Sequence, residues 1–144
     1  MKIIEVTVYS PEVHHSIEAL LEVLLAKKTE ITEEFLQKIT ASDNSYLFLA
    51  IDNNDAVLGM LTLAIYSSPS GTKSWIEDVA VHSAHQGQGL GRQLMQFAIQ
   101  FAKQKETDMI MLTSNPKRIA ANKLYQSLDF ERKETNVYKL IVRE

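Results

Sequence analysis

The sequence predicts an α/β (α+β) domain with about four helices and a mixed, mostly antiparallel sheet of about seven strands. Three observations support this fold class. Apolar residues recur with strand or helix periodicity in the order βααβββαβαββ. The turn-rich link at residues 52–55 joins two strand patterns as a hairpin would. The strand, helix and strand across residues 75–113 require a parallel pair with a right-handed crossover, which we expect in the centre of the sheet.

The N-terminal half is expected to begin with a strand and two helices. Residues 3–9 alternate as a strand does, and Ser10 and Pro11 then supply an N-cap and a first helical residue. Acidic residues in the first turn after Thr32 predict a second, short helix that ends at residue 39. Strands at 46–51 and 57–66 follow. The first helix has an apolar face made of Val13, Ile17, Leu20, Leu21, Leu24 and Leu25.

The C-terminal half is expected to alternate strands and helices. Turn residues 69–71 lead into a strand at 73–81, and a glycine-rich turn separates this strand from a helix at 90–104. A strand at 109–113 follows, and a helix at 117–128 begins after Pro116. Residues 130–134 and 137–142 are predicted to form a final pair of strands.

Length and composition indicate one domain over residues 1–144, long enough to bury its own core. The chain has no cysteine, which excludes disulfides, thiol nucleophiles and thiolate metal sites. Glu5 interrupts the N-terminus before the apolar core of a signal peptide can form. The apolar region at 17–26 is too short to span a membrane. We therefore expect a cytoplasmic protein that does not bind membranes.

Charge is distributed unevenly along the chain. Residues 1–85 hold 5 Lys and Arg against 12 Asp and Glu, a net charge of −7, whereas residues 86–123 carry +4 and residues 124–144 are neutral. The total of −3 argues against a nucleic-acid partner. The basic stretch suits a polyanionic cofactor, although solvated lysines and arginines on helices explain it equally well.

A glycine-rich turn, with Gly87, Gly89 and Gly91, precedes the helix at 90–104. Such a turn leaves backbone N–H groups free at the positive end of the helix dipole, where phosphates bind. The simpler explanation of the three glycines is that they only satisfy the geometry of a tight turn. A Walker loop is excluded because Arg92 follows Gly91 where that motif needs lysine. A dinucleotide fingerprint would need glycine at position 92 and an acidic residue ending the next strand, whereas Asp108 begins it.

Two motifs resemble those of the GNAT superfamily of N-acetyltransferases. The first is Gln-x-x-Gly-x-Gly at residues 86–91, after the strand Ile-Glu-Asp-Val-Ala-Val. The second is Ala-x-x-Leu-Tyr-x-x-x-x-Phe at residues 121–130. The element order of the family can be laid over nearly the whole chain. Asp129 stands where the family usually has glycine, so we expect its backbone in or near the left-handed region, which Asp tolerates better than most residues.

The resemblance implies acetyl-coenzyme A as a co-substrate, held where the two parallel strands splay apart, and no metal. Asn115 would bond the pantetheine arm, although a turn residue before Pro116 explains it as well. Arg118 stands seven residues before Tyr125, where many relatives have asparagine, and we expect it to reach a phosphate or an anionic group of the acceptor. His82 and His85 lack a third ligand and are expected to be solvated. The residues expected to bind the cofactor are Val79, Ala80, Val81, Gln86, Gly87, Gln88, Gly89, Leu90, Gly91, Arg92, Asn115, Arg118 and Tyr125.

The resemblance also implies the catalytic residues. Tyr125 matches the general acid that protonates the departing thiolate, and a core tyrosine is the structural alternative. Glu77 and Asp78 are adjacent on a strand and should face opposite sides of the sheet. We favour Glu77 as the base that removes the amine proton, directly or through water. The backbone N–H of Val79 is a candidate donor to the thioester oxygen, and the backbone of Val79 and Val81 would pair with pantetheine.

The predicted function is acetyl transfer from acetyl-coenzyme A to a primary amine of a small molecule, by direct attack in a ternary complex. The acidic first 85 residues favour a cationic amine. The alternatives are acetylation of a protein or peptide amine, a non-catalytic coenzyme A sensor or interaction module, and a dinucleotide enzyme. The identity of the acceptor and the existence of a homodimer stay open at this point.

Overall fold

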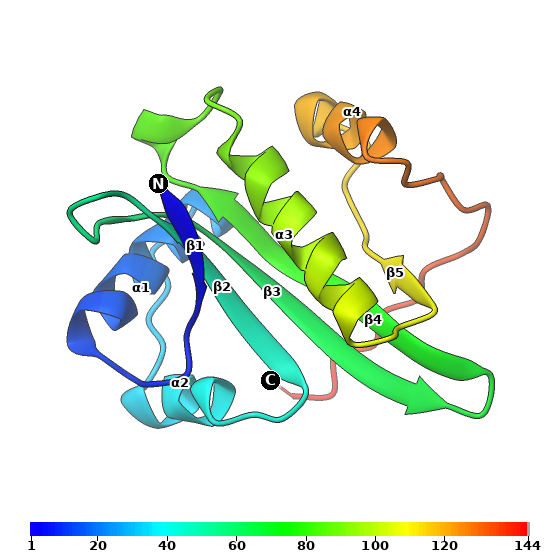
Figure 1. Ribbon diagram of the computed structural model, residues 1–144, viewed down its shortest axis with the longest axis horizontal. Helices are drawn as coiled ribbons and strands as arrows, with labels where there is room; N and C mark the ends of the chain where they lie inside the picture. Colours follow the sequence, from blue (N-terminus) through cyan, green and yellow to red (C-terminus); the bar gives the residue numbers. More distant parts are fainter. Residues whose placement is uncertain (144) are drawn as a thin grey trace. The chain divides into compact units, whose positions relative to one another are not determined.

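The computed structural model describes residues 1–143, and the chain forms two compact units, Met1–Thr113 and Ser114–Glu144. The first unit contains a five-stranded sheet in the order β1-β2-β3-β4-β5 (Figure 1). Neighbouring strands run antiparallel from β1 to β4, whereas β4 and β5 are parallel. The predicted mixed sheet with a parallel pair is therefore confirmed, although that pair lies at the edge rather than in the centre.

The elements of the first unit follow the predicted order. They are β1 (Lys2–Glu5), α1 (Pro11–Leu25), α2 (Glu33–Thr40), β2 (Ser45–Ile51), β3 (Val57–Ser68), β4 (Gly71–Val81), the short 3₁₀ helix η1 (Ser83–His85), α3 (Leu90–Gln104) and β5 (Met109–Met111). The second unit contains α4 (Ile119–Ser127). The four predicted α-helices are thus confirmed. None of the helices in residues 1–143 is long and apolar enough to cross a membrane.

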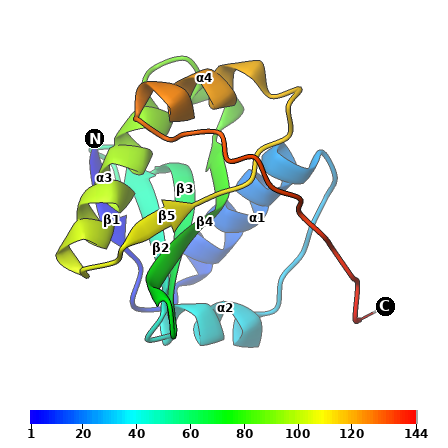
Figure 2. The same cartoon turned by 90° about the vertical axis from the view of Figure 1, so that its right-hand side faces the viewer.

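Helices cover both faces of the sheet: α1 and α2 lie on one face and α3 on the other (Figure 2). Alternate side chains of β2 pack against the helices on opposite faces of the sheet, because successive side chains of a strand point to opposite sides. Leu47 and Leu49 join Leu20 of α1 and Leu36 of α2 in one buried cluster. On the opposite face Phe48 packs edge-to-face against two aromatic rings of α3, with centroid distances of 5.0 Å. These aromatic contacts pack α3 against the sheet.

Local signals explain why the helix starts were predicted well. Ser10 caps α1, its side-chain oxygen accepting a hydrogen bond from the Val13 N–H at 3.2 Å. Thr32 caps α2 in the same way through the Phe35 N–H at 3.1 Å. Each bond satisfies one of the N–H groups that a helix start leaves without a partner.

The strand prediction was wrong in three places. β1 ends at Glu5 rather than at residue 9, because the chain leaves the sheet to enter the Ser10 cap. β5 covers three residues, not five. Residues 130–134 and 137–142 lie in no strand of the described chain, so the sheet has five strands instead of about seven. Periodicity predicts that a segment suits a strand, but it supplies no neighbour for it. The single N-acetyltransferase domain stays a prediction.

Candidate functional site

The parallel strands β4 and β5 are paired only at one end. The register joins Lys73 to Met109, Ser74 to Ile110 and Trp75 to Met111. Residues 76–81, the second half of β4, have no neighbour on the β5 side within the described sheet. Backbone N–H and C=O groups on this side are therefore available to an extended ligand that adds itself to the strand edge.

A hydrogen-bonded clamp holds the paired end. Asp108 accepts a bond from the Thr72 N–H through Oδ2 at 2.9 Å, and its own N–H donates to the Thr72 carbonyl at 2.7 Å. The buried Ser74 hydroxyl donates to the Met109 carbonyl at 3.1 Å. The Asp108 carboxylate is thus engaged at the start of β5. This placement argues against the dinucleotide alternative, which needs an acidic side chain at the strand's carboxyl end.

The unpaired half of β4 contains a β-bulge. Thr62 of β3 pairs with Glu77, but Met60 pairs with Ala80, so two residues of β4 face one residue of β3. Asp78 has a φ of 51°, in the left-handed region that the first residue of a G1 bulge adopts. The regular alternation predicted for residues 75–81 is therefore interrupted after Glu77, and the opposite orientation of Glu77 and Asp78 stays a prediction. Glu77 and Ala80 consequently share one face of the sheet, the face that α1 covers.

The backbone of Val81 points to the free edge of β4. The His82 N–H donates to the Leu58 carbonyl of β3 at 2.8 Å, and backbone groups alternate in direction along an antiparallel ladder. The Val81 carbonyl accepts a bond from Gln86 Nε2 at 3.2 Å. This bond ties the following loop back to the strand, which gives Gln86 a structural role. A carbonyl oxygen has a second lone pair, so the Val81 backbone can still bind a ligand.

The glycine-rich loop is exposed and ends in an uncapped helix. Gly87 and Gly89 have φ values of 77° and 80°, which glycine adopts without strain. A Cβ at either position would meet no atom within 4 Å, so backbone conformation, not crowding, requires glycine there. Gly89 is the N-cap of α3 and no side chain caps the first turn. The N–H groups of Leu90 and Gly91 therefore lack intrahelical acceptors at the positive end of the helix.

In the second unit, Tyr125 is fixed by the end of α4. The Phe130 N–H donates to the Tyr125 carbonyl at 3.0 Å and the Asp129 N–H to the Gln126 carbonyl at 3.1 Å. These are the two bonds of a Schellman motif. Asp129 takes a φ of 70°, which confirms its predicted left-handed conformation. The rings of Tyr125 and Phe130 contact each other with centroids 6.2 Å apart. The Tyr-x-x-x-x-Phe spacing thus follows from the geometry of this helix end.

The two candidate catalytic groups have raised pKa values. Burial raises the pKa of the Glu77 carboxyl, and the neighbouring Asp78 carboxylate raises it further. Burial also raises the pKa of the Tyr125 phenol, which the positive charge of Arg118 partly offsets. A base with a raised pKa accepts a proton more readily, and a phenol with a raised pKa stays protonated at neutral pH.

The loop before α4 is built around two asparagines. Asn115 Oδ1 accepts a bond from the Lys117 N–H at 2.9 Å, as a turn residue does. Asn122 Nδ2 donates to the carbonyls of Asn115 at 3.0 Å and Arg118 at 2.8 Å. The roles of Asn115 and Arg118 toward a cofactor stay predictions. The sequence analysis did not predict these bonds of Asn122. A polar side chain in the first turns of a helix that follows an Asn-Pro turn could have indicated them.

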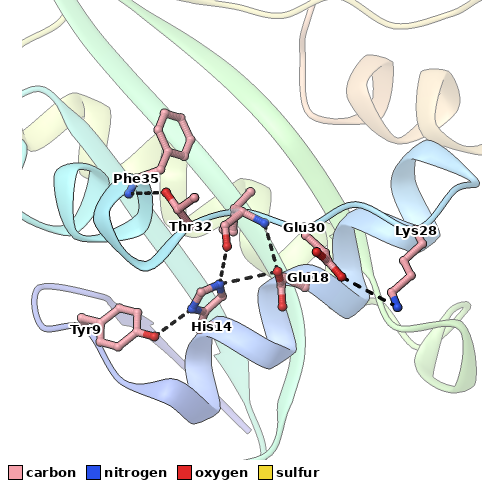
Figure 3. A network of polar contacts seen from close by, with 8 residues as sticks. Tyr9, His14, Glu18, Lys28, Glu30, Thr32 and Phe35 are labelled. Atoms are coloured by element: carbon pink, nitrogen blue, oxygen red, sulfur yellow. Dashed lines mark hydrogen bonds and ion pairs between the residues drawn. The ribbon is translucent and has the colours of Figure 1, made fainter.

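A network that the sequence did not reveal connects α1 to the segment before α2 (Figure 3). Tyr9 Oη lies 2.8 Å from His14 Nδ1, and His14 Nε2 lies 2.8 Å from the Ile31 carbonyl oxygen. Because a carbonyl only accepts, Nε2 carries a proton and donates it to Ile31, and Nε2 also lies 3.5 Å from Glu18 Oε2. The Ile31 N–H donates to Glu18 at 3.0 Å. These bonds fix the connection between α1 and α2.

The structure gathers the predicted residues in two places. In the first unit, Glu77 and the stretch from Val79 to Arg92 follow one another along the free end of β4, the loop and the start of α3. In the second unit, two of the predicted residues, Asn115 and Arg118, precede α4, and Tyr125 lies within it. The described residues contain no group of three side chains suited to a metal.

Comparison with known proteins points to one family. A model described as the acetyltransferase (GNAT) family matches residues 14–130, most of the chain. A solved structure described as a putative acetyltransferase from Agrobacterium tumefaciens str. C58 superimposes with a TM-score of 0.86 at 21% identity, covering 98% of this chain and all of the other. At this identity the superposition shows a shared fold alone.

Two curated relatives are considerably longer than this chain. A mycothiol acetyltransferase of Renibacterium salmoninarum is 35% identical over 92 residues, which cover 62% of this chain and 27% of that protein. An N-acetyltransferase 8B of Rattus norvegicus is 29% identical over 105 residues, covering 72% of this chain and 45% of the relative. The chain therefore spans less than half the length of either relative.

Proposed function

The chain belongs to the acetyltransferase (GNAT) family, and we propose that it transfers the acetyl group of acetyl-coenzyme A to a primary amine of a small molecule. The observation that carries the proposal lies in the first unit. Within residues 1–143, β4 is unpaired beyond Trp75 on its β5 side, and the exposed glycine loop and the start of α3, which has no side-chain cap, follow directly. A free strand edge can pair with the amides of an extended arm, and a helix N-terminus that follows it can bind the pyrophosphate at the end of that arm.

In this proposal coenzyme A binds mainly to backbone groups. The amides of its pantetheine arm pair with Val79 and Val81 at the free edge of β4. Its pyrophosphate accepts hydrogen bonds from the N–H groups of the loop and the first turn, including those of Gly89 and Leu90. The positive φ of Gly87 and Gly89 supports this assignment, since it turns successive N–H groups outward around an anion.

The chemistry is direct attack within a ternary complex. The amine nitrogen forms a bond to the thioester carbonyl carbon, and the carbon–sulfur bond breaks as the intermediate collapses. Glu77 removes the proton from the attacking amine, directly or through water, and Tyr125 gives its phenol proton to the departing thiolate. The Val79 N–H stabilises the developing oxyanion. Such a donor is typically worth about 2.7–4 kcal/mol of the barrier.

The acceptor is proposed to be a small cationic amine. One relative is named mycothiol acetyltransferase, which supports a small-molecule acceptor. The net charge of −7 over residues 1–85 favours a cation over an anionic acceptor. A sensor that binds coenzyme A without turnover is the alternative. The raised pKa values of Glu77 and Tyr125 favour an enzyme, because perturbed acids and bases gather at catalytic sites.

Release of coenzyme A thiol from acetyl-coenzyme A, measured across a panel of amines, tests the proposal. The panel includes amino sugars, polyamines, small aliphatic amines and lysine-containing peptides. We expect amine-dependent thiol release, with intersecting double-reciprocal plots when both substrates are varied. Turnover of peptides alone would contradict the small-molecule acceptor. Binding of coenzyme A without turnover of any amine would support the sensor instead, and binding of a nicotinamide nucleotide in its place would support the dinucleotide alternative.

A further inference from the structure

One face of the β3–β4 hairpin presents two aromatic side chains beside the proposed base. The register between the strands is regular from residue 71 to residue 77, so Lys73, Trp75 and Glu77 point to the same side of the sheet. Tyr66 pairs directly with Lys73 and shares that side. Successive side chains on one face of a strand lie about 7 Å apart. The face therefore presents, in order, a cation, an aromatic pair and a carboxylate.

The aromatic pair is held together by a hydrogen bond. Trp75 Nε1 donates to Tyr66 Oη at 3.1 Å, which restricts the rotation of the indole ring. The buried cluster beneath α1 and α2 extends to Ala80 on this face, but neither aromatic residue belongs to it. Packing in that cluster therefore does not explain the pair. The face of an indole ring attracts cations and stacks with other rings, so the pair can bind an amine that carries a ring.

Lys73 places a positive charge on the side of the pair away from Glu77. Its ammonium group donates to Ser68 Oγ at 3.1 Å and to Ser70 Oγ at 2.6 Å, so it is directed toward the turn of the hairpin. An acceptor whose amine lies beside Glu77 would bring a second cationic group at its far end toward this charge, and the two would repel each other. An acceptor with one amine and an uncharged far end avoids this repulsion.

We propose that the acceptor is an arylalkyl monoamine, whose ring stacks on Trp75 while its amine lies beside Glu77. The inference rests on the acetyl transfer proposed above and names its substrate class. A chain of about two or three carbon atoms between the amine and the ring spans the distance from the carboxylate to the indole. Trp75 then determines specificity by direct contact. Tyr66 is a positioning residue, because it acts through the indole N–H.

Tryptophan fluorescence gives the first test, since Trp75 is the one tryptophan of the chain. Phenethylamine, added to the protein in the presence of saturating coenzyme A, should change the emission of Trp75 saturably. Cyclohexylethylamine has the same linker without an aromatic ring, and its Kd should be about 2–10-fold higher. Equal Kd values, or acetylation of both amines without any change in emission, would overturn the proposal.

The values of kcat/KM for matched amines give the second test. Phenethylamine should be preferred to cyclohexylethylamine, and pentylamine to diaminopentane after allowance for the two equivalent amines of the latter. Trp75→Leu should abolish the first preference, whereas Trp75→Phe, which retains a ring, should keep most of it. Lys73→Met should weaken the second preference about 2–10-fold at low ionic strength and less in high salt. Lys2→Met, on β1, is the matched control and should alter neither preference.

Tyr66→Phe tests the positioning role and keeps the proposal testable if Trp75→Leu fails to fold. The variant retains a ring but cannot accept the indole N–H, so KM should rise more for phenethylamine than for pentylamine. An equal change for both amines would overturn the role of the pair. Thiol release with amines but without a preference that depends on Trp75 would overturn the acceptor class and leave acetyl transfer in place. No thiol release with any amine would overturn the proposed function itself.

Discussion

The end of α4 fixes the position of Tyr125 and also the surroundings of its phenol group. The Schellman motif at the end of α4 fixes its backbone through the Phe130 N–H, and the Phe130 ring contacts the phenol ring. Burial raises its pKa, so the phenol remains a proton donor throughout the neutral pH range. Burial and the contact with Phe130 fit a packed tyrosine as well as a general acid, so the catalytic role of Tyr125 stays a prediction.

Replacement of Tyr125 by Phe should lower kcat about 10²–10⁴-fold, the usual contribution of a general acid. The phenyl ring preserves the contact with Phe130, so the melting temperature and the affinity for coenzyme A should hardly change. Single-turnover kinetics with the wild type must first show that acetyl transfer is rate-limiting. An unchanged rate constant under those conditions would make Tyr125 a core residue.

Replacement of Glu77 should change both the reaction rate and the stability of the fold. Its pKa is raised in the folded protein, so folding favours the protonated form. The stability associated with protonation is full below the ordinary pKa of 4.5 and is lost as pH rises through the folded value. Glu77→Gln should therefore raise the melting temperature at neutral pH and have little effect below pH 4.5.

The same variant should lower the plateau of the pH–rate profile and move its break toward the pKa of the free amine. Asp78→Asn is the matched neighbour, and it should alter stability through the bulge more than the rate. If Asp78→Asn abolishes activity in a stable protein while Glu77→Gln remains near wild type, the base is Asp78. The bulge makes this comparison necessary, because it interrupts the regular alternation on which the choice of Glu77 depends.

At the scale of elements, predictions succeeded where local sequence decides structure. Ser10 and Thr32 begin helices because their side chains cap the first turn. Asp129 ends α4 in the left-handed conformation, as expected from its place in the motif. The bulge at Asp78 was not predicted, because no glycine marks it and its cause is the pairing of β4 with a distant strand. The terminal strands failed for the same reason: strand pairing is non-local.

The conformation of Asp129 gives a stability prediction. Asp129→Gly should stabilise the protein by about 0.5–1 kcal/mol, because glycine adopts positive φ without a Cβ penalty. Asp129→Val should destabilise it by about 1–2 kcal/mol, the cost of the left-handed region for a branched side chain. Urea unfolding measures both changes. Glu131→Gly, two residues later, is the control and should give no gain; an equal effect at both sites would contradict the account.

At the scale of the whole molecule, sequence reasoning identified the family and the sheet's parallel pair, and the family model matches residues 14–130. Sequence reasoning did not identify which residues confine the pairing of β4 and β5 to one end. That opening depends on the clamp between Thr72 and Asp108 at one end and on the shortness of β5 at the other. Neither is encoded by a local pattern, since the two clamped residues are far apart in sequence. The acceptor amine likewise lies beyond what motifs specify.

The central claim is that coenzyme A binds along the free end of β4 and the glycine loop. Titration of the ¹⁵N-labelled protein with coenzyme A, followed by amide chemical shifts, tests this claim most directly. The largest shifts should occur at Val79, Val81, Gly87, Gly89 and Leu90, and a nicotinamide dinucleotide should not reproduce them. Saturable binding that leaves these amides unchanged, or no binding at all, would contradict the claim.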